Sequence, residues 1–258
     1  MAEITVCLIA IALKTHPKWP LVVLANRDEF YDRPTRHLGF WPDAPLIGGR
    51  DLLAGGTWLA LSRSGRFSAV TNYREGGRSF PHSRSRGTLP TDFLLGTQPA
   101  AQFTPDPRIE SGYNLLCADH SGIFYHSNRG GHTQRLEPGI HTLSNGLLES
   151  RWPKQRNLQQ ALEQALGRAD TTPESLLALL LDERTAPDSE LPATGISLER
   201  ERLLSRCFIR SPGYGTRART LILQNNEGET LIEEVQQDPL GTTGRASYRL
   251  DLPPLGWN

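Results

Sequence analysis

The sequence predicts an α+β fold with mainly antiparallel sheets. Pairs of short aliphatic and β-branched runs, each pair joined by turn-forming residues, recur from the first residues to the last third of the chain. Between them lies a region in which apolar residues recur at near-helical spacing. The 258 residues contain no Gly/Ser-rich linker, low-complexity tract or internal repeat, so we expect one domain over residues 1–258.

The first hairpin joins a run over residues 4–13 to a run over residues 21–25. The segment between the two runs contains two prolines and is unable to continue a strand. If the chain reverses at Pro17, Cys7 lies opposite Arg27. Cross-strand neighbours project to the same face, so we expect the thiol and the guanidinium to be in contact.

This contact matters because the thiolate, and not the thiol, is the nucleophile. A free cysteine with a reference pKa of about 8.5 is only about 3 % ionised at pH 7. A fixed neighbouring cation lowers such a pKa by about 1 to 3 units, and Arg27 supplies a charge that pH does not remove. The alternative is that Cys7 is a small buried hydrophobe and that residues 26–29 form a solvated strand end.

Three further hairpins are predicted from the same pattern of paired runs and turn residues. In the second, Gly65 favours a tight reversal between the two strands. The hairpins join residues 57–61 to 67–72, residues 114–118 to 123–126, and residues 220–224 to 230–235.

Helices are expected in the middle of the chain. Apolar residues at near-helical spacing predict a helix over residues 150–166. Thr172 before Pro173 is a good start for a second helix over residues 174–181, and a shorter helix is expected over residues 91–95. Strands on both sides of a helical middle agree with an α+β fold but do not define how its layers are stacked.

Charge and hydropathy exclude several classes of partner. Lys plus Arg and Asp plus Glu both number 28, so no bulk field attracts nucleic acid or an anionic membrane. No apolar stretch approaches the length of a membrane-spanning helix. The first apolar run follows Glu3, has no basic start and lacks a small-residue cleavage site, which argues against a signal peptide. We expect no integral membrane segment and a cytoplasmic location; the oligomeric state is not predicted.

Cysteine, histidine and glycine patterns argue against a metal or phosphate site. Three widely spaced cysteines, Cys7, Cys117 and Cys207, do not form a disulfide framework or a zinc knuckle, and they favour a reducing compartment. The spacing of the histidines in HSNRGGH matches no standard zinc site, so no metal is expected. Glycines 48, 49, 55 and 56 match neither a phosphate loop nor a dinucleotide fingerprint, and we expect them to form turns.

An arginine cluster lies in a Gly- and Ser-rich stretch that is typical of a mobile loop. Arg78, Arg84 and Arg86 surround Pro81 and His82. They form either a solvated loop or a clamp for a substrate carboxylate or a propionate.

Four segments carry a family resemblance. They are CLIAIALKTHPKWPLVVLANRDEFYDRPT, GGTWLALSRSGRFSAVTNY (residues 55–73), LSNG (residues 143–146) and YGTRARTLIL (residues 214–223). In this order they resemble the NRDE family, also called the Transport and Golgi organization 2 family. That family is similar in its expected architecture to N-terminal nucleophile hydrolases, especially the cysteine branch with bile salt hydrolases and penicillin V acylase. The resemblance implies a four-layer αββα fold with two mainly antiparallel sheets.

The resemblance also implies site residues. By position, Cys7 matches the nucleophile, Arg27 the residue that tunes its pKa, and Asp28 a partner of the amine or the thiol. Asn72 and Asn145 would donate to an oxyanion, although asparagine is also a routine turn residue. The ligand-binding residues expected around them are Asn26, Glu29, Arg84, Arg86 and Arg217.

One departure from the hydrolase pattern bears on mechanism. In those enzymes the nucleophile is the first residue, and its α-amine, with a pKa of about 7.7 to 8.0, is the general base. Here residues 1–6 precede Cys7, and a peptide nitrogen is not a base. Two routes would restore the site: self-cleavage before Cys7, or a misassigned start in which Val6 is a GTG initiator read as Met and then removed.

Two functions are therefore left open. The first is hydrolysis of a carbon–nitrogen bond in a small-molecule amide substrate, with no required cofactor. The second is a carrier that uses the same pocket, because the family is associated with haem trafficking and with acyl-lipid handling. Haem would then be a transported ligand, and without a CxxCH motif its iron would bind one of four residues, Cys7, His16, His82 or His126.

Overall fold

Two antiparallel sheets form the centre of the protein. A computed structural model describes residues 6–76, 78, 80 and 83–255, and within them each sheet has seven strands. The first sheet contains, in spatial order, β10 (Gly139–Leu143), β1 (Val6–Leu13), β2 (Leu21–Phe30), β12 (Tyr214–Gln224), β13 (Glu229–Asp238) and β14 (Gly241–Asp251), with β11 (Arg210–Ser211) paired to β12. The second sheet follows the chain order: β3 (Thr35–Phe40), β4 (Leu46–Asp51), β5 (Leu59–Ser62), β6 (Phe67–Asn72), β7 (Tyr113–Asp119), β8 (Gly122–Ser127) and β9 (Gln134–Arg135).

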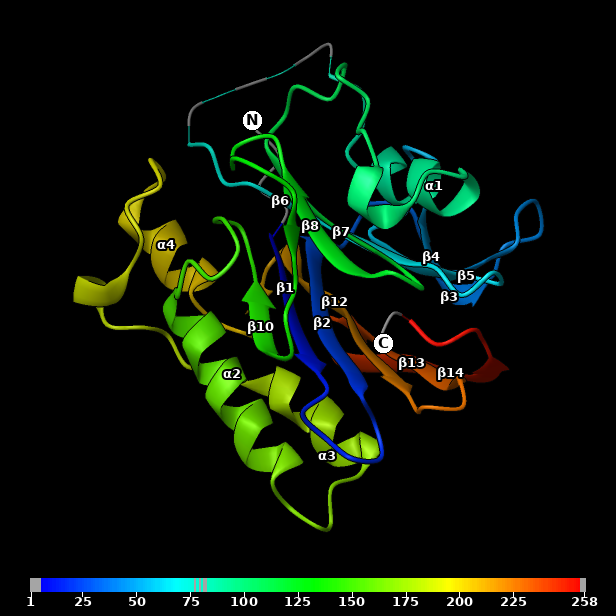
Figure 1. Cartoon of the computed structure of the whole chain (residues 1–258). Coiled ribbons are helices and arrows are strands. Elements are labelled where there is room, and N and C mark those ends of the chain that lie inside the picture. The colour runs from blue at the N-terminus through cyan, green and yellow to red at the C-terminus, as the bar shows by residue number, and fades with distance from the viewer. Residues whose placement is uncertain (1–5, 77, 79, 81–82, 256–258) are drawn as a thin grey trace.

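The helices cover the outer faces of the two sheets (Figure 1). Leucines of α2 (Pro153–Leu166) and α3 (Pro173–Ala178) pack on the first sheet, and α1 (Thr88–Leu95) packs on the second. A separate apolar core fills the space between the sheets. The four-layer αββα order that the family resemblance implies is therefore confirmed. The remaining helices are α4 (Leu198–Leu204) and the 3-10 turns η1 (Ala100–Gln102), η2 (Leu179–Leu181) and η3 (Asp188–Glu190).

The strand β1 is buried on both faces. Ile9 and Ile11 point into the core between the sheets, whereas Leu8 and Ala10 point toward the helices. This double burial explains the uninterrupted apolar run, because a strand with one wet face would alternate with polar residues. The same alternation directs Cys7 toward the space between the sheets.

The predicted hairpins are confirmed. In the first, Cys7 pairs with Arg27, and β1 and β2 continue in this register to Leu13 and Leu21; residues 4 and 5 of the expected strand lie outside the described residues. The other three correspond to β5–β6, β7–β8 and β12–β13. The helix expected over residues 150–166 begins at Pro153, and the one expected over 174–181 ends as the 3-10 turn η2.

Several strands were not predicted, and the expectation that Gly48 and Gly49 form turns is wrong. Gly48 and Gly49 lie inside β4, not in a turn. A Cβ atom at Gly48 would come within 2.6 Å of the Leu59 carbonyl oxygen, so the close approach of β4 to β5 requires glycine there. By contrast, Gly55 has a φ of 77° and does occupy a turn.

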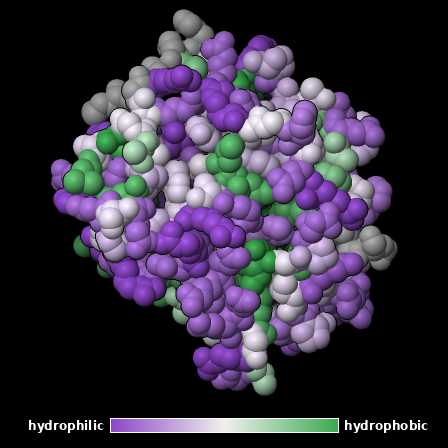
Figure 2. All heavy atoms as spheres, turned by 60° about the vertical axis from the view of Figure 1, so that its left-hand side comes forward, coloured by the Kyte–Doolittle hydropathy of each residue, from purple (hydrophilic) through white to green (hydrophobic). Residues whose placement is uncertain are grey.

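The outer surface of the helical layer is mostly polar. Figure 2 shows the face that carries α2 and α4, where hydrophilic side chains surround limited apolar patches. Among the described residues, no helix combines the length and the hydropathy that crossing a bilayer requires.

Candidate active site

A pocket of about 310 Å³ lies where β1 begins, and Cys7 forms part of its wall. Arg27 and Glu29 from β2 and Asn72 from the end of β6 line the pocket as well. Polar and charged side chains from β3, β4 and the segment leading into α1 complete most of the lining. The pocket therefore collects residues from distant parts of the chain around one thiol.

The thiol of Cys7 is protonated at neutral pH in this form of the chain. Burial raises the pKa of Cys7 to about 12, the charges of Asp28 and Glu29 raise it as well, and Arg27 opposes them. Arg27 lowers the pKa in the expected direction, but its effect is outweighed, so the thiolate is not the majority species here. One cation next to a residue that is only 3 % exposed does not outweigh desolvation plus two carboxylates.

Arg27 is also shared with other groups, because the pocket wall alternates positive and negative charges. Arg27 Nη2 lies 3.4 Å from Glu29 Oε2, which is in turn 3.6 Å from Arg33 Nε. Arg33 Nη2 then contacts Asp51 Oδ2 at 2.8 Å. Arg33 and Asp51 line the pocket but were not predicted, since neither belongs to a sequence motif that indicates a functional site. Glu29 is placed in the pocket as expected.

Two predicted amides and one serine connect the neighbouring elements. Asn145 Nδ2 donates to the Asn72 carbonyl oxygen at 2.8 Å, and Ser144 Oγ donates to the Cys7 carbonyl oxygen at 2.9 Å. The loop after β10 thus ties the start of β1 to the end of β6. The structure brings Cys7, Asn72 and Asn145 together, and their role as oxyanion donors stays a prediction. Ser144 had no signal in the sequence beyond its place in LSNG.

Arg84 and Arg86 also reach the pocket. Arg84 Nη1 contacts Asp92 Oδ2 at 2.9 Å and Asp106 Oδ2 at 2.8 Å, so two carboxylates hold this guanidinium. Arg86 Nη1 donates to the Gly112 carbonyl oxygen at 3.1 Å. Both residues line the pocket, and their role as a clamp for a substrate carboxylate stays a prediction. Pro81 and His82 lie outside the described residues.

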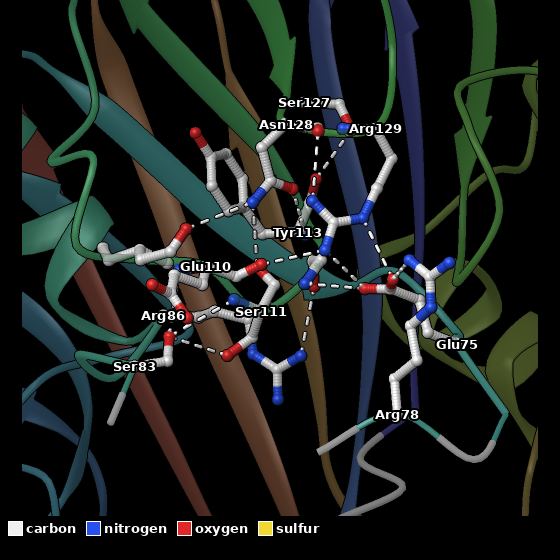
Figure 3. A network of polar contacts seen from close by, with 12 residues as sticks. Glu75, Arg78, Ser83, Arg86, Glu110, Ser111, Tyr113, Ser127, Asn128 and Arg129 are labelled. Atoms are coloured by element: carbon white, nitrogen blue, oxygen red, sulfur yellow. Dashed lines mark hydrogen bonds and ion pairs between the residues drawn. The ribbon is translucent and has the colours of Figure 1, made fainter. Parts of the chain in front are cut away.

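A polar network anchors the second half of the loop that carries Arg78, Arg84 and Arg86 (Figure 3). Ser83 Oγ accepts from the backbone N–H groups of Glu110 and Ser111 at 3.1 and 3.2 Å. Glu75 accepts from the Gly112 N–H at 2.9 Å and from Arg129 Nε at 3.0 Å. From Ser83 onward, the segment that we expected to be mobile is therefore held against residues 110–112.

Glu75→Ala is expected to lower the free energy of unfolding by about 2 kcal/mol, because a largely buried carboxylate with charged and backbone donors is lost. Arg78→Ala is the matched control, since Arg78 contacts the same carboxylate at 3.2 Å but its side chain is 68 % exposed. Urea unfolding monitored by fluorescence measures both. Equal losses for the two variants would show that Glu75 does not anchor the loop.

Three predicted residues lie away from Cys7. Asn26 faces the helices, and its amide donates to the Leu180 and Cys207 carbonyl oxygens at 3.0 and 2.8 Å, so the expectation that it binds ligand beside Cys7 is corrected. The Asp28 carboxyl also faces the helices, on the other side of β2 from the thiol, whereas the Asp28 backbone hydrogen-bonds the Cys7 sulfur. Its role as a partner of a free amine stays a prediction. Arg217 braces the wall next to Arg27 and donates to the Phe30 carbonyl oxygen at 3.1 Å.

The carboxyl of Asp28 is expected to make stability depend on pH. Burial raises its pKa from 3.8 to about 7, against the opposing effects of Lys154, Thr216 and Arg27. Between about pH 4 and pH 7 the native state therefore holds a proton that the unfolded chain has already released. The free energy of unfolding falls as pH rises through that range. Asp28→Asn is expected to remove at least about 1 kcal/mol of the fall between pH 5 and pH 8. Urea unfolding at both pH values tests this, and an equal fall in both proteins contradicts it.

Two of the expected haem ligands are already engaged. The ring nitrogens of His126 contact the Ala100 carbonyl oxygen at 3.0 Å and Thr133 Oγ1 at 3.1 Å. The His16 ring accepts from the Trp19 N–H at 3.2 Å in the turn between β1 and β2, at the opposite end of β1 from Cys7. His82 lies outside the described residues.

Comparisons with known proteins agree with the resemblance read from the sequence. The family model described as Transport and Golgi organisation 2 matches residues 6–238. The Transport and Golgi organization protein 2 homolog of Bos taurus is 35 % identical over 236 residues, covering 83 % of this chain and 85 % of that protein. The Homo sapiens homolog is 34 % identical with the same coverage.

Two solved structures show a weaker likeness. An N-acylethanolamine-hydrolyzing acid amidase ortholog from Caenorhabditis elegans matches with a TM-score of 0.41 and 14 % identity, covering 84 % of this chain and 92 % of that one. A C2A mutant of a conjugated bile acid hydrolase from Clostridium perfringens matches with a TM-score of 0.35 and 10 % identity, covering 94 % and 96 %.

Proposed function

We propose, from the premise that this chain belongs to the Transport and Golgi organisation 2 family, that its Cys7 pocket hydrolyses carbon–nitrogen bonds in small amides once Cys7 is the first residue. The observation that supports this most directly is the position of Cys7. It lies opposite Arg27 in the strand pair and contributes to the wall of a pocket large enough for a small ligand.

The chemistry requires a base that the chain lacks while Val6 precedes Cys7. A free α-amine at Cys7 would take the thiol proton, and the sulfur would then bond to the amide carbon. The carbon–nitrogen bond breaks as the proton passes to the leaving amine, and water cleaves the thioester to release the acid. The amide of Asn72, at the pocket wall, is the proposed donor to the oxyanion.

The guanidinium donors of the lining suit a substrate that carries an acidic group. The lining contains five arginines and two carboxylates, and Asp43, Asp92 and Asp106 balance the remaining formal charge from outside the pocket. Leu53, Trp58 and Phe80 add apolar surface for a short acyl chain. The proposed substrates are therefore N-acyl compounds with a carboxylate on the amine side.

The test compares two proteins, one with residues 1–258 and one beginning at Cys7 after removal of an initiator Met. Intact mass verifies each N-terminus, and a panel of N-acyl amino acids reports hydrolysis. We expect turnover only from the protein that begins at Cys7. Equal turnover with residues 1–6 attached contradicts the amine as base, and no turnover from either protein contradicts the function.

A haem or acyl-lipid carrier in the same pocket is the alternative proposal. Among the described residues that line the pocket, Cys7 is the only cysteine or histidine, and its thiol is protonated at neutral pH. Saturable haem binding without N-acyl hydrolysis would favour the carrier. For either function we propose the cytoplasm as the compartment, in keeping with three cysteines that are free thiols.

A further inference from the structure

A buried lysine lies on the far side of β2 from the pocket. Lys154 is the second residue of α2, and it is 2 % exposed. Its Nζ atom has no hydrogen-bond partner among the described residues. An ammonium group removed from water without a partner is costly, so such a lysine is seldom present for packing alone.

The opposite charge that acts most strongly on Lys154 is Asp28, which β2 directs toward the same layer. Asp28 is fully buried, and Oδ1 accepts from Thr216 Oγ1 at 2.5 Å. Its second oxygen, Oδ2, has no hydrogen-bond partner in the described part of the chain. An orphan carboxylate oxygen and an orphan ammonium thus occupy one buried layer, one from β2 and one from α2.

Burial brings the pKa values of the two groups close together, and their mutual attraction opposes this. Burial lowers the pKa of Lys154 to about 8, and the Asp28 charge opposes that shift. Burial raises the pKa of Asp28 to about 7, and the Lys154 charge opposes that shift. The other groups that act on this pair are Arg74, Cys207, Cys7, Thr216, Arg27 and Glu29.

The pair is linked to the nucleophile through charge. The Asp28 carboxylate raises the pKa of the Cys7 thiol, and a Cys7 thiolate raises the pKa of Lys154. Because an electrostatic interaction is reciprocal, a charged Lys154 must also favour the thiolate. With both groups charged, their effects on the sulfur partly cancel.

We propose that Lys154 is a positioning residue for the Cys7 site, acting through Asp28 on the helix side of β2, and that this buried pair controls the reactivity of the Cys7 thiol. The inference rests on the proposed function only in treating Cys7 as the nucleophile. Loss of the lysine charge leaves Asp28 alone behind the thiol and suppresses the thiolate. Loss of the Asp28 charge has the opposite effect.

The test is the rate at which iodoacetamide alkylates each cysteine of the full chain at pH 8.5, read by peptide mass spectrometry. We expect Asp28→Asn to raise the Cys7 rate by about fivefold or more, and Lys154→Met to lower it by a similar factor. The double variant should return to within about twofold of the unmodified protein. Cys117, buried in the second sheet, is the internal control for general opening of the fold.

Shifts of opposite sign support the proposal, because a merely structural role would move both variants in one direction. It is overturned if the two Cys7 rates move together, or if neither moves while the Cys117 rate is unchanged. A second measurement needs no variant. Between pH 6.5 and 8.5 the Cys7 rate of the unmodified chain should rise less than tenfold per pH unit, because Asp28 ionises over the same range.

A full tenfold rise per pH unit throughout that range would also overturn the proposal. Alkylation does not require amide hydrolysis, so the two ideas fail separately. Absence of hydrolysis with opposite shifts at Cys7 removes the proposed function and leaves the electrostatic role of Lys154. Hydrolysis with Cys7 rates that do not shift in the variants removes the electrostatic role of Lys154 and leaves the proposed function.

Discussion

In a protein that begins at position 7, Cys7→Ala is expected to lower kcat/KM for N-acyl hydrolysis by at least about a thousandfold, because covalent catalysis loses its nucleophile. Hydroxyl groups in the pocket do not replace it. Ser83 Oγ, one of the lining hydroxyls, already accepts three hydrogen bonds from residues 110 and 111. A residual rate near that of water is the expected floor.

Two further variants make this result specific. Cys7→Ser keeps a nucleophile of similar size but with a much less acidic proton, and we expect its activity to be low and its acyl intermediate to be long-lived. Cys117→Ala changes a buried cysteine of the second sheet and should retain activity in protein that stays folded. Turnover by Cys7→Ala within tenfold of the starting protein would refute the nucleophile.

The largest effect on stability is expected for Glu201→Ala, at about 3 to 5 kcal/mol of unfolding free energy. Glu201 Oε2 lies 2.8 Å from Arg74 Nη1, and both side chains are buried. The carboxylate also accepts from the Thr194 N–H at 3.0 Å. Without it, Arg74 becomes a buried cation with no carboxylate partner, since its Nε and Nη2 atoms have no hydrogen-bond partner among the described residues and only the Trp152 ring faces the guanidinium, at 4.8 Å.

The matched control is Asp188→Ala. Asp188 pairs with Arg202, which lies beside Glu201 on α4, but both side chains are about half exposed, at 51 % and 49 %. Solvent screening should limit its loss to less than about 1 kcal/mol. Urea titrations at one pH compare the two variants, and similar losses would contradict the importance that we assign to burial. Arg74 also donates its N–H to the Asn145 carbonyl oxygen at 2.7 Å, so this pair fastens α4 to the loop beside the pocket.

The parts of the fold with strong local signals could be predicted. The two prolines between the first strands, with the chain reversal taken at Pro17, were enough to place Cys7 opposite Arg27, because register in a hairpin is set by its turn. In contrast, β14 has a mostly exposed face with alternating polar residues, and β4 contains two glycines, so neither has the composition of a strand. Their assignment depends on the neighbouring strands.

The location of the candidate site could be predicted from the sequence, but the protonation state of Cys7 could not. Given that Arg27 faces Cys7, alternation alone requires Asn26 and Asp28 to face the other way, so that correction was within reach of the sequence. The high pKa of Cys7 was not, because desolvation depends on the layers that pack around the thiol. The same holds for Lys154, whose isolation in the buried layer has no sequence signature.

The alternating charges of the pocket wall have a consequence for recognition. Arg27, Glu29, Arg33 and Asp51 hold one another in fixed orientations. A free arginine side chain loses up to about 2 kcal/mol of rotamer entropy when a ligand immobilises it. In this wall the rotamer entropy is lost when the protein folds, so a ligand meets hydrogen-bond donors that are already ordered. We therefore expect the pocket to select ligands by the fit of their shape to fixed donors, and not by rearrangement of its side chains.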